Sequence, residues 1–109
     1  MRKLKFNVDN QIITRDPNCD FDNLIPGTKG YLRAEFAFTP DWNGWIKTAT
    51  FYSALGIEYG TKELKDGKSC AIPTEALKRR AFKIRITGEK NGSTITTNKV
   101  VVQQRGGSK

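Results

Sequence analysis

The sequence predicts an all-β domain, an antiparallel β-sandwich of seven to eight short strands with at most one short helix. Short segments of alternating apolar and polar residues recur about ten residues apart along the chain. Three Asn-Gly or Asp-Gly pairs, at residues 43–44, 66–67 and 91–92, supply the positive φ angles that tight chain reversals need. With 109 residues, the chain has the size of one domain with one core.

The first strands are predicted at residues 3–8 and 11–15, joined by a turn into an opening hairpin. Residues 3–8 alternate strictly, which is typical of a half-buried strand. Residues 16–30 are rich in Asp, Asn, Pro and Gly, and we expect a loop there. Its aspartates do not predict a calcium site, because the glycine and closing glutamate of an EF-hand are absent.

The segment 31–52 is predicted to organise the core, since it holds both tryptophans and three of the six phenylalanines. It divides into a central strand, a tight corner at residues 40–44 and a second strand. We expect at least one of Trp42 and Trp45 to cap the open end of the core. The alternative is an exposed platform near Lys47, on which bases or sugars would stack.

The second half of the chain continues the pattern. Strands are predicted at residues 57–65, 69–72, 81–87 and 94–104, with one or two helical turns from residue 73. Consecutive hairpins favour an immunoglobulin-like sandwich over a closed barrel. The folded domain is therefore expected to cover residues 1–104, followed by a flexible basic tail at residues 105–109.

The formal charge of +8 comes from 19 Lys and Arg against 11 Asp and Glu. These cations are spread along the whole chain, a distribution typical of a solvated surface. Arg79, Arg80, Lys83 and Arg85 lie close in sequence, and any nucleic-acid contact there would be purely electrostatic. The candidate partner-binding residues are Trp42, Trp45, Lys47, Arg79, Arg80, Lys83 and Arg85.

No pattern in the sequence indicates catalysis. The chain has no histidine, no GxSxG elbow and no glycine-rich phosphate loop, so no catalytic, cofactor-binding or metal-binding residue is predicted. Cys19 and Cys70 form no CxxC pair, and without a secretory signal we expect two buried or half-buried thiols rather than a disulfide. No apolar run reaches membrane-spanning length, so no membrane association is expected.

Four stretches resemble a group of small phage and prophage proteins of Gram-positive gut bacteria: KLKFNV, GTKGYLRAEFAFTPDWNGWIKTATF, SCAIPTEAL and FKIRITGEKNGSTITTNKVVVQQ. Asp41-Trp42 matches an Asp-Trp of that group, and residues 47–51 match its Lys-Thr-Ala-x-Phe run. Residues 70–75 match a Cys-x-(Val/Ile)-Pro-x-Glu segment, and residues 96–98 match a closing Thr-Thr-Asn. Thr74 stands where the group usually has an aromatic residue.

The resemblance implies an immunoglobulin-like domain of virion components such as the tail, baseplate, fibre or capsid decoration. We therefore expect a non-enzymatic structural or adaptor protein, made in the host bacterial cytoplasm and located in the virion. It would dock on other virion proteins in multiple copies, through loops and through sheet edges such as residues 3–8 or the final strand. The alternative is a phage-encoded inhibitor of a host defence nuclease, or a basic nucleic-acid-associated protein.

Overall fold

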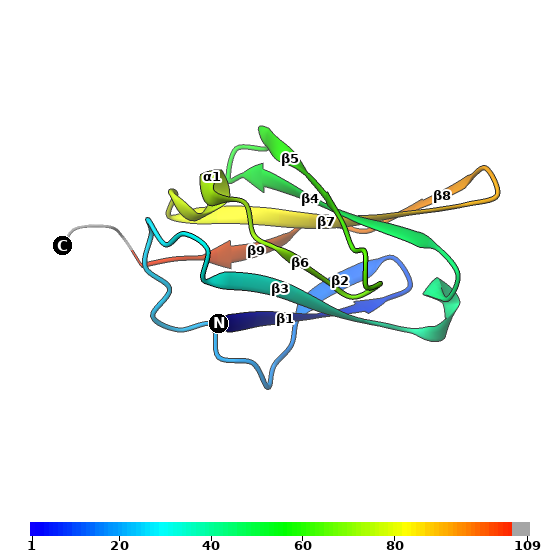
Figure 1. Ribbon diagram of the computed structural model, residues 1–109, viewed down its shortest axis with the longest axis horizontal. Helices are drawn as coiled ribbons and strands as arrows, with labels where there is room; N and C mark the ends of the chain where they lie inside the picture. Colours follow the sequence, from blue (N-terminus) through cyan, green and yellow to red (C-terminus); the bar gives the residue numbers. More distant parts are fainter. Residues whose placement is uncertain (106–109) are drawn as a thin grey trace.

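Two β-sheets packed face to face form the structure, a computed structural model that describes residues 1–105 (Figure 1). Its helical segments are a single 3-10 turn, η1 (Pro40–Trp42), and one four-residue helix, α1 (Thr74–Leu77). The nine strands are β1 (Arg2–Asp9), β2 (Ile12–Arg15), β3 (Leu32–Phe38), β4 (Ile46–Ser53), β5 (Glu58–Glu63), β6 (Ser69–Ala71), β7 (Ala81–Lys90), β8 (Ser93–Thr96) and β9 (Val100–Gln103). The predicted all-β sandwich is confirmed.

The strands divide into a four-stranded and a five-stranded sheet. The first has the order β2-β1-β3-β6, and the second has the order β5-β4-β7-β8 with β9 also paired to β7. The predicted final strand at residues 94–104 is split into β8 and β9, which lie one after the other along the same edge of β7. This split accounts for one strand more than the sequence predicts.

The pairing of β1 with β3 is parallel, which differs from the antiparallel arrangement that the sequence predicts. The predicted loop explains the difference, because residues 16–31 carry the chain back to the starting end of β1 before β3 begins. As a result β1 lies between β2 and β3, so residues 3–8 do not form the free edge that we expected to dock on a partner. The final strand, β9, does lie at an edge.

Two of the three predicted reversals carry the chain from one sheet to the other. The corner at residues 40–44 joins β3 to β4, and Asp66-Gly67 joins β5 to β6. Only Asn91-Gly92 makes a tight hairpin, between β7 and β8, with φ angles of 50° and 83°. The predicted opening hairpin of β1 and β2 is also present.

Apolar residues at alternate positions form the core between the sheets. In β7, for example, Phe82, Ile84 and Ile86 are fully buried, as their spacing predicts. A run of aromatic rings extends the core into the corner, with 5.3 Å between the ring centroids of Phe38 and Trp42. Burying each large apolar side chain contributes about 1.5–3 kcal/mol, so these strands supply most of the stability.

Asn98 fastens the two sheets together along one side. Its Oδ1 accepts a hydrogen bond from the N–H of Ile13 at 2.7 Å, and its Nδ2 donates to the Ile13 carbonyl at 3.2 Å. The side-chain amide thus pairs with β2 as a strand residue would. Thr97 binds the five-stranded sheet instead: its Oγ1 accepts a hydrogen bond from the Ile86 N–H at 3.0 Å. These two residues explain the break between β8 and β9.

Gly88 is expected to tolerate no side chain. A Cβ built there lies 2.7 Å from Cζ3 of Trp42 and 3.0 Å from Cγ2 of Ile95. We expect Gly88→Ala to lower the free energy of unfolding by about 1–3 kcal/mol through overpacking, measured by urea denaturation. Thr87→Val, one residue earlier on the opposite face, is the control and should change it by less than about 0.5 kcal/mol. An unchanged urea midpoint in Gly88→Ala would contradict the tight contact.

Removing the Asn98 side chain should loosen the join between the sheets. Asn98→Ala leaves two main-chain groups of the buried Ile13 without these partners, which should cost about 1–3 kcal/mol of unfolding free energy. Amide hydrogen exchange should show faster exchange at Ile13. The control is Gln103→Ala, an exposed position on β9. Equal exchange at Ile13 in both variants would count against the bridge.

Candidate functional site

The seven residues predicted to bind a partner fall in three separate places. Trp42, Trp45 and Lys47 belong to the corner and the start of β4. Lys83 and Arg85 lie on the outer face of the five-stranded sheet. Arg79 and Arg80 lie between α1 and β7. The structure therefore does not gather them into one site.

At the corner, the tryptophans belong mainly to the core. Trp42 is 0% exposed, and its Nε1 donates a hydrogen bond of 2.8 Å to the Asn10 carbonyl. Trp45 is half-buried, with its ring centroid 6.5 Å from that of Trp42. Trp42 closes the core, as expected of at least one tryptophan, and its ring is not available for stacking on a ligand.

Lys47 is directed onto the same corner. Its Nζ lies 5.2 Å from the centroid of the Phe38 ring and donates a hydrogen bond of 3.2 Å to the Trp45 carbonyl. The ammonium group is thus engaged with the protein's own aromatic residues. The corner serves the fold, and we do not place a partner on it.

On the outer face of the five-stranded sheet, two cations lie over one aromatic ring, and a third belongs to the residue paired with it. Lys83 and Arg85 pair in register with Tyr52 and Thr50 of β4. The Nζ of Lys99 lies 4.2 Å from the centroid of the Tyr52 ring, and Cζ of Arg85 lies 5.9 Å from it. We call Tyr52, Lys83, Arg85 and Lys99 the basic face.

The sequence did not point to Lys99, because residues 94–104 were predicted to form one uninterrupted strand. The signal that marks its position is the Thr-Asn pair that breaks the strand. The ion pairs found within residues 1–105 are Arg2 with Asp20 and Lys78 with Glu75. The cations of the basic face are therefore not neutralised by a carboxylate within 4.0 Å in this part of the chain.

A groove lies between the β4–β5 turn and the connection from α1 to β7. Figure 1 shows both of these segments at the same end of the sandwich. The groove has a volume of about 390 Å³. We call it the end groove, and its lining residues are Ser53, Ala54, Leu55, Ile57, Tyr59, Arg79, Arg80 and Ala81. It brings two predicted cations together with apolar side chains that sequence reasoning did not single out.

The apolar wall of the end groove is a fixed turn. Leu55 is 91% exposed and Ile57 is 65% exposed. The Ser53 hydroxyl accepts hydrogen bonds from the N–H groups of both residues, at 3.2 and 3.0 Å, and the Ser53 N–H donates to the Ile57 carbonyl at 2.7 Å. Gly56 takes the positive φ of 96° that closes the turn. Two large apolar side chains are thus displayed to solvent from an ordered backbone.

The basic wall is fixed by one buried glutamine. Nε2 of Gln104 donates to the carbonyls of Leu77 and Arg79, at 3.1 and 2.6 Å, and its backbone N–H donates to the Arg80 carbonyl at 2.6 Å. These bonds hold the backbone of both arginines in place. No Asp or Glu is among the residues that line the groove. One wall of the end groove is therefore positively charged, and the opposite wall is apolar.

Gln104 also bears on the predicted tail. The next residue, Arg105, donates its backbone N–H to the Leu24 carbonyl at 2.7 Å and its Nη1 to Oδ1 of Asn23 at 2.9 Å. Arg105, which was assigned to the tail, is therefore attached to the domain. The remainder of the predicted tail, residues 106–109, lies outside the described residues.

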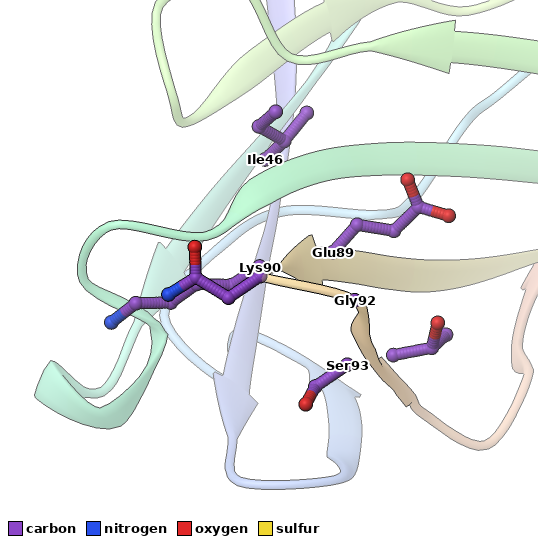
Figure 2. A pocket seen from close by; sticks show the side chains of 7 residues that line it. Ile46, Glu89, Lys90, Gly92 and Ser93 are labelled. Carbon is purple, nitrogen blue, oxygen red and sulfur yellow. The ribbon is translucent and has the colours of Figure 1, made fainter.

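A second hollow, of about 290 Å³, lies beside the β7–β8 hairpin (Figure 2). Ile46 lies on one side of it, and the hairpin supplies Glu89, Lys90 and Ser93. Figure 2 shows the side chains of Glu89 and Lys90 pointing away from each other. The two side chains therefore do not converge on one position in the hollow.

Both cysteines are free thiols, as predicted, with Cys19 half-buried and Cys70 buried. Burial away from water raises the pKa of the Cys70 thiol to about 11, so it stays protonated at neutral pH and is a poor nucleophile. Residues 1–105 contain no group of three or more His, Cys, Asp or Glu side chains placed to hold a metal ion. Within the same residues, no helix is long and apolar enough to cross a bilayer.

Comparison with protein-family models, with curated proteins and with solved structures gives no match.

The two thiols should differ sharply in reactivity. We expect iodoacetamide at pH 8 to alkylate Cys19 in the native protein while Cys70 stays unmodified, because Cys70 is 5% exposed and its pKa is raised to about 11. Peptide mass spectrometry after a timed quench measures both sites. Unfolding in urea is the control and should make the two rates similar. Equal native rates would contradict the burial of Cys70.

Proposed function

We propose that this chain is a non-enzymatic docking protein, a structural or adaptor subunit that binds other proteins through the surface of a rigid sandwich. The observation that carries the proposal is the end groove, where Leu55 and Ile57 are held in solvent by a hydrogen-bonded turn. Exposed apolar area costs about 25 cal/mol per Å² relative to burial. Several large apolar side chains exposed together are typical of a binding surface.

The narrower form of the proposal is a subunit of a phage particle, present in several copies in the tail, baseplate or fibre, or as capsid decoration. This form rests on the sequence resemblance described above. A rigid β-sandwich is compatible with such a role, in which shape and adhesion matter more than chemistry. At any of these places in the particle, the chain would dock on other subunits through its loops and sheet edges.

Of the sheet edges, β9 is the more suitable for adding a partner strand. It pairs with β7 on one side, and its Val101 is 40% exposed. The opposite edge strand, β5, carries Lys62 and Glu63 among its exposed residues, and charged side chains discourage edge pairing. We place the main contact at the end groove and treat the β9 edge as a second contact.

The basic face supports a second candidate function, an inhibitor of a host nuclease or a nucleic-acid-associated protein. Arg85 and Lys99 lie over the Tyr52 ring, and Lys83 pairs with Tyr52 in register. A cationic surface with an aromatic ring attracts phosphate and stacks on a base. Binding of this kind weakens steeply as salt rises, because it depends on counterion release. Sensitivity to nuclease therefore separates docking on a protein from binding to nucleic acid.

Purified particles of the phage or prophage that encodes the chain should contain it. We expect mass spectrometry to detect its peptides in the particles after treatment with nuclease and washing at about 1 M NaCl, where the Debye length is roughly 3 Å. Retention after both treatments supports docking by apolar contact. Release by nuclease would favour the basic face instead. Absence from untreated particles would overturn the particle form of the proposal.

A further inference from the structure

We propose that the end groove binds an extended segment of a partner protein in which a large apolar side chain is flanked by carboxylates. This inference rests on the proposed docking function and gives it a surface and a partner chemistry. The groove offers an apolar wall at Leu55 and Ile57, and a basic wall at Arg79 and Arg80. A segment that satisfies both walls must carry both kinds of group.

The apolar wall sets the first requirement. Leu55 and Ile57 are exposed on a turn that Ser53 holds in place, and Tyr59 beside them packs against the core. A partner that covers these two side chains would gain about 1.5–3 kcal/mol for each one that it buries fully. An apolar side chain in the groove supplies that cover.

The basic wall sets the second requirement. An arginine forms paired, charge-assisted hydrogen bonds with a carboxylate, and such bonds are stronger than neutral ones. The groove lining itself contains no acid to take this role, and no ion pair joins Arg79 or Arg80 to a carboxylate within the described chain. A carboxylate that pairs with these arginines would therefore come from the partner.

Nucleic acid fits the end groove less well than an acidic peptide. Phosphates would pair with the two arginines, but Leu55 and Ile57 offer them no hydrogen-bond donor, and the apolar wall would stay in water. The basic face, by contrast, combines its cations with an aromatic ring. The two surfaces thus have distinct chemistry, and the end groove favours protein.

The rigidity of both walls supports binding. Ser53 holds one wall with three hydrogen bonds, and Gln104 holds the other with two hydrogen bonds from its side chain and backbone to the arginine carbonyls. A surface that is already ordered loses less conformational entropy on association. The entropy cost falls mainly on the partner segment.

The proposal is tested by selecting a random twelve-residue peptide library, displayed on phage, against the immobilised full-length protein. We expect enriched peptides to carry Asp or Glu next to Leu, Ile, Phe or Trp. The most enriched peptide is then labelled with fluorescein, and its Kd is measured by anisotropy. We expect Arg79→Ala/Arg80→Ala and Leu55→Ser each to raise Kd by about tenfold, which corresponds to about 1.4 kcal/mol.

The matched control is Lys83→Ala/Lys99→Ala, which removes the same charge from the basic face and should change Kd by less than about twofold. Urea midpoints of all variants establish that each is folded. The proposal is overturned if selection yields no enriched peptide, or if enriched peptides lack acidic or apolar residues. Unchanged binding to either groove variant also overturns it. The proposal is also overturned if the protein forms a concentration-dependent dimer that Arg79→Ala/Arg80→Ala abolishes. That result would assign the groove to a second copy of the chain.

The outcomes also separate this inference from the proposed function. If the chain is found in particles but peptide selection fails, docking stands and the end groove is the wrong surface. If selection succeeds but the chain is absent from particles, the groove chemistry stands and the particle role falls.

Discussion

The packing of the Trp42 ring against the backbone of Gly88 is the contact on which the sandwich depends. It lets the chain leave β3 in one sheet and enter β4 in the other while the corner stays filled. Both long central strands, β4 and β7, are positioned from this point. The indole occupies the space where a side chain at position 88 would lie, so Gly88 lets the corner pack directly on the sheet.

The local elements could be predicted from the sequence, whereas their long-range pairing could not. Alternation in Phe82, Ile84 and Ile86 identifies a strand and its buried face, and Asn91-Gly92 identifies its hairpin. Asp66-Gly67 has the same local chemistry, yet it leads into the other sheet. A turn sequence sets the backbone angles but not the strand that lies beside the next segment. The parallel register of β1 and β3 likewise depends on how a long loop closes.

In the candidate site, too, the local sequence indicates which residues are charged or apolar but not where the fold places them. Four cations between positions 79 and 85 look like one patch in the sequence. In the structure the strand places Lys83 and Arg85 on a sheet face, and the preceding connection places Arg79 and Arg80 at the end of the sandwich. Leu55 and Ile57 look like ordinary apolar residues near a turn, and only tertiary structure shows that they remain in solvent. Exposure is a property of the whole fold.

The Asn98 side chain joins the sheets by binding main-chain atoms of Ile13 and not its side chain. Position 13 is thus free to vary among apolar residues during evolution without loss of this bridge, and proline alone, which lacks the N–H group, would remove it. Position 98 has no such latitude, since few side chains carry a donor and an acceptor side by side at that reach. Mutational drift should therefore be strongly unequal between two residues that touch each other.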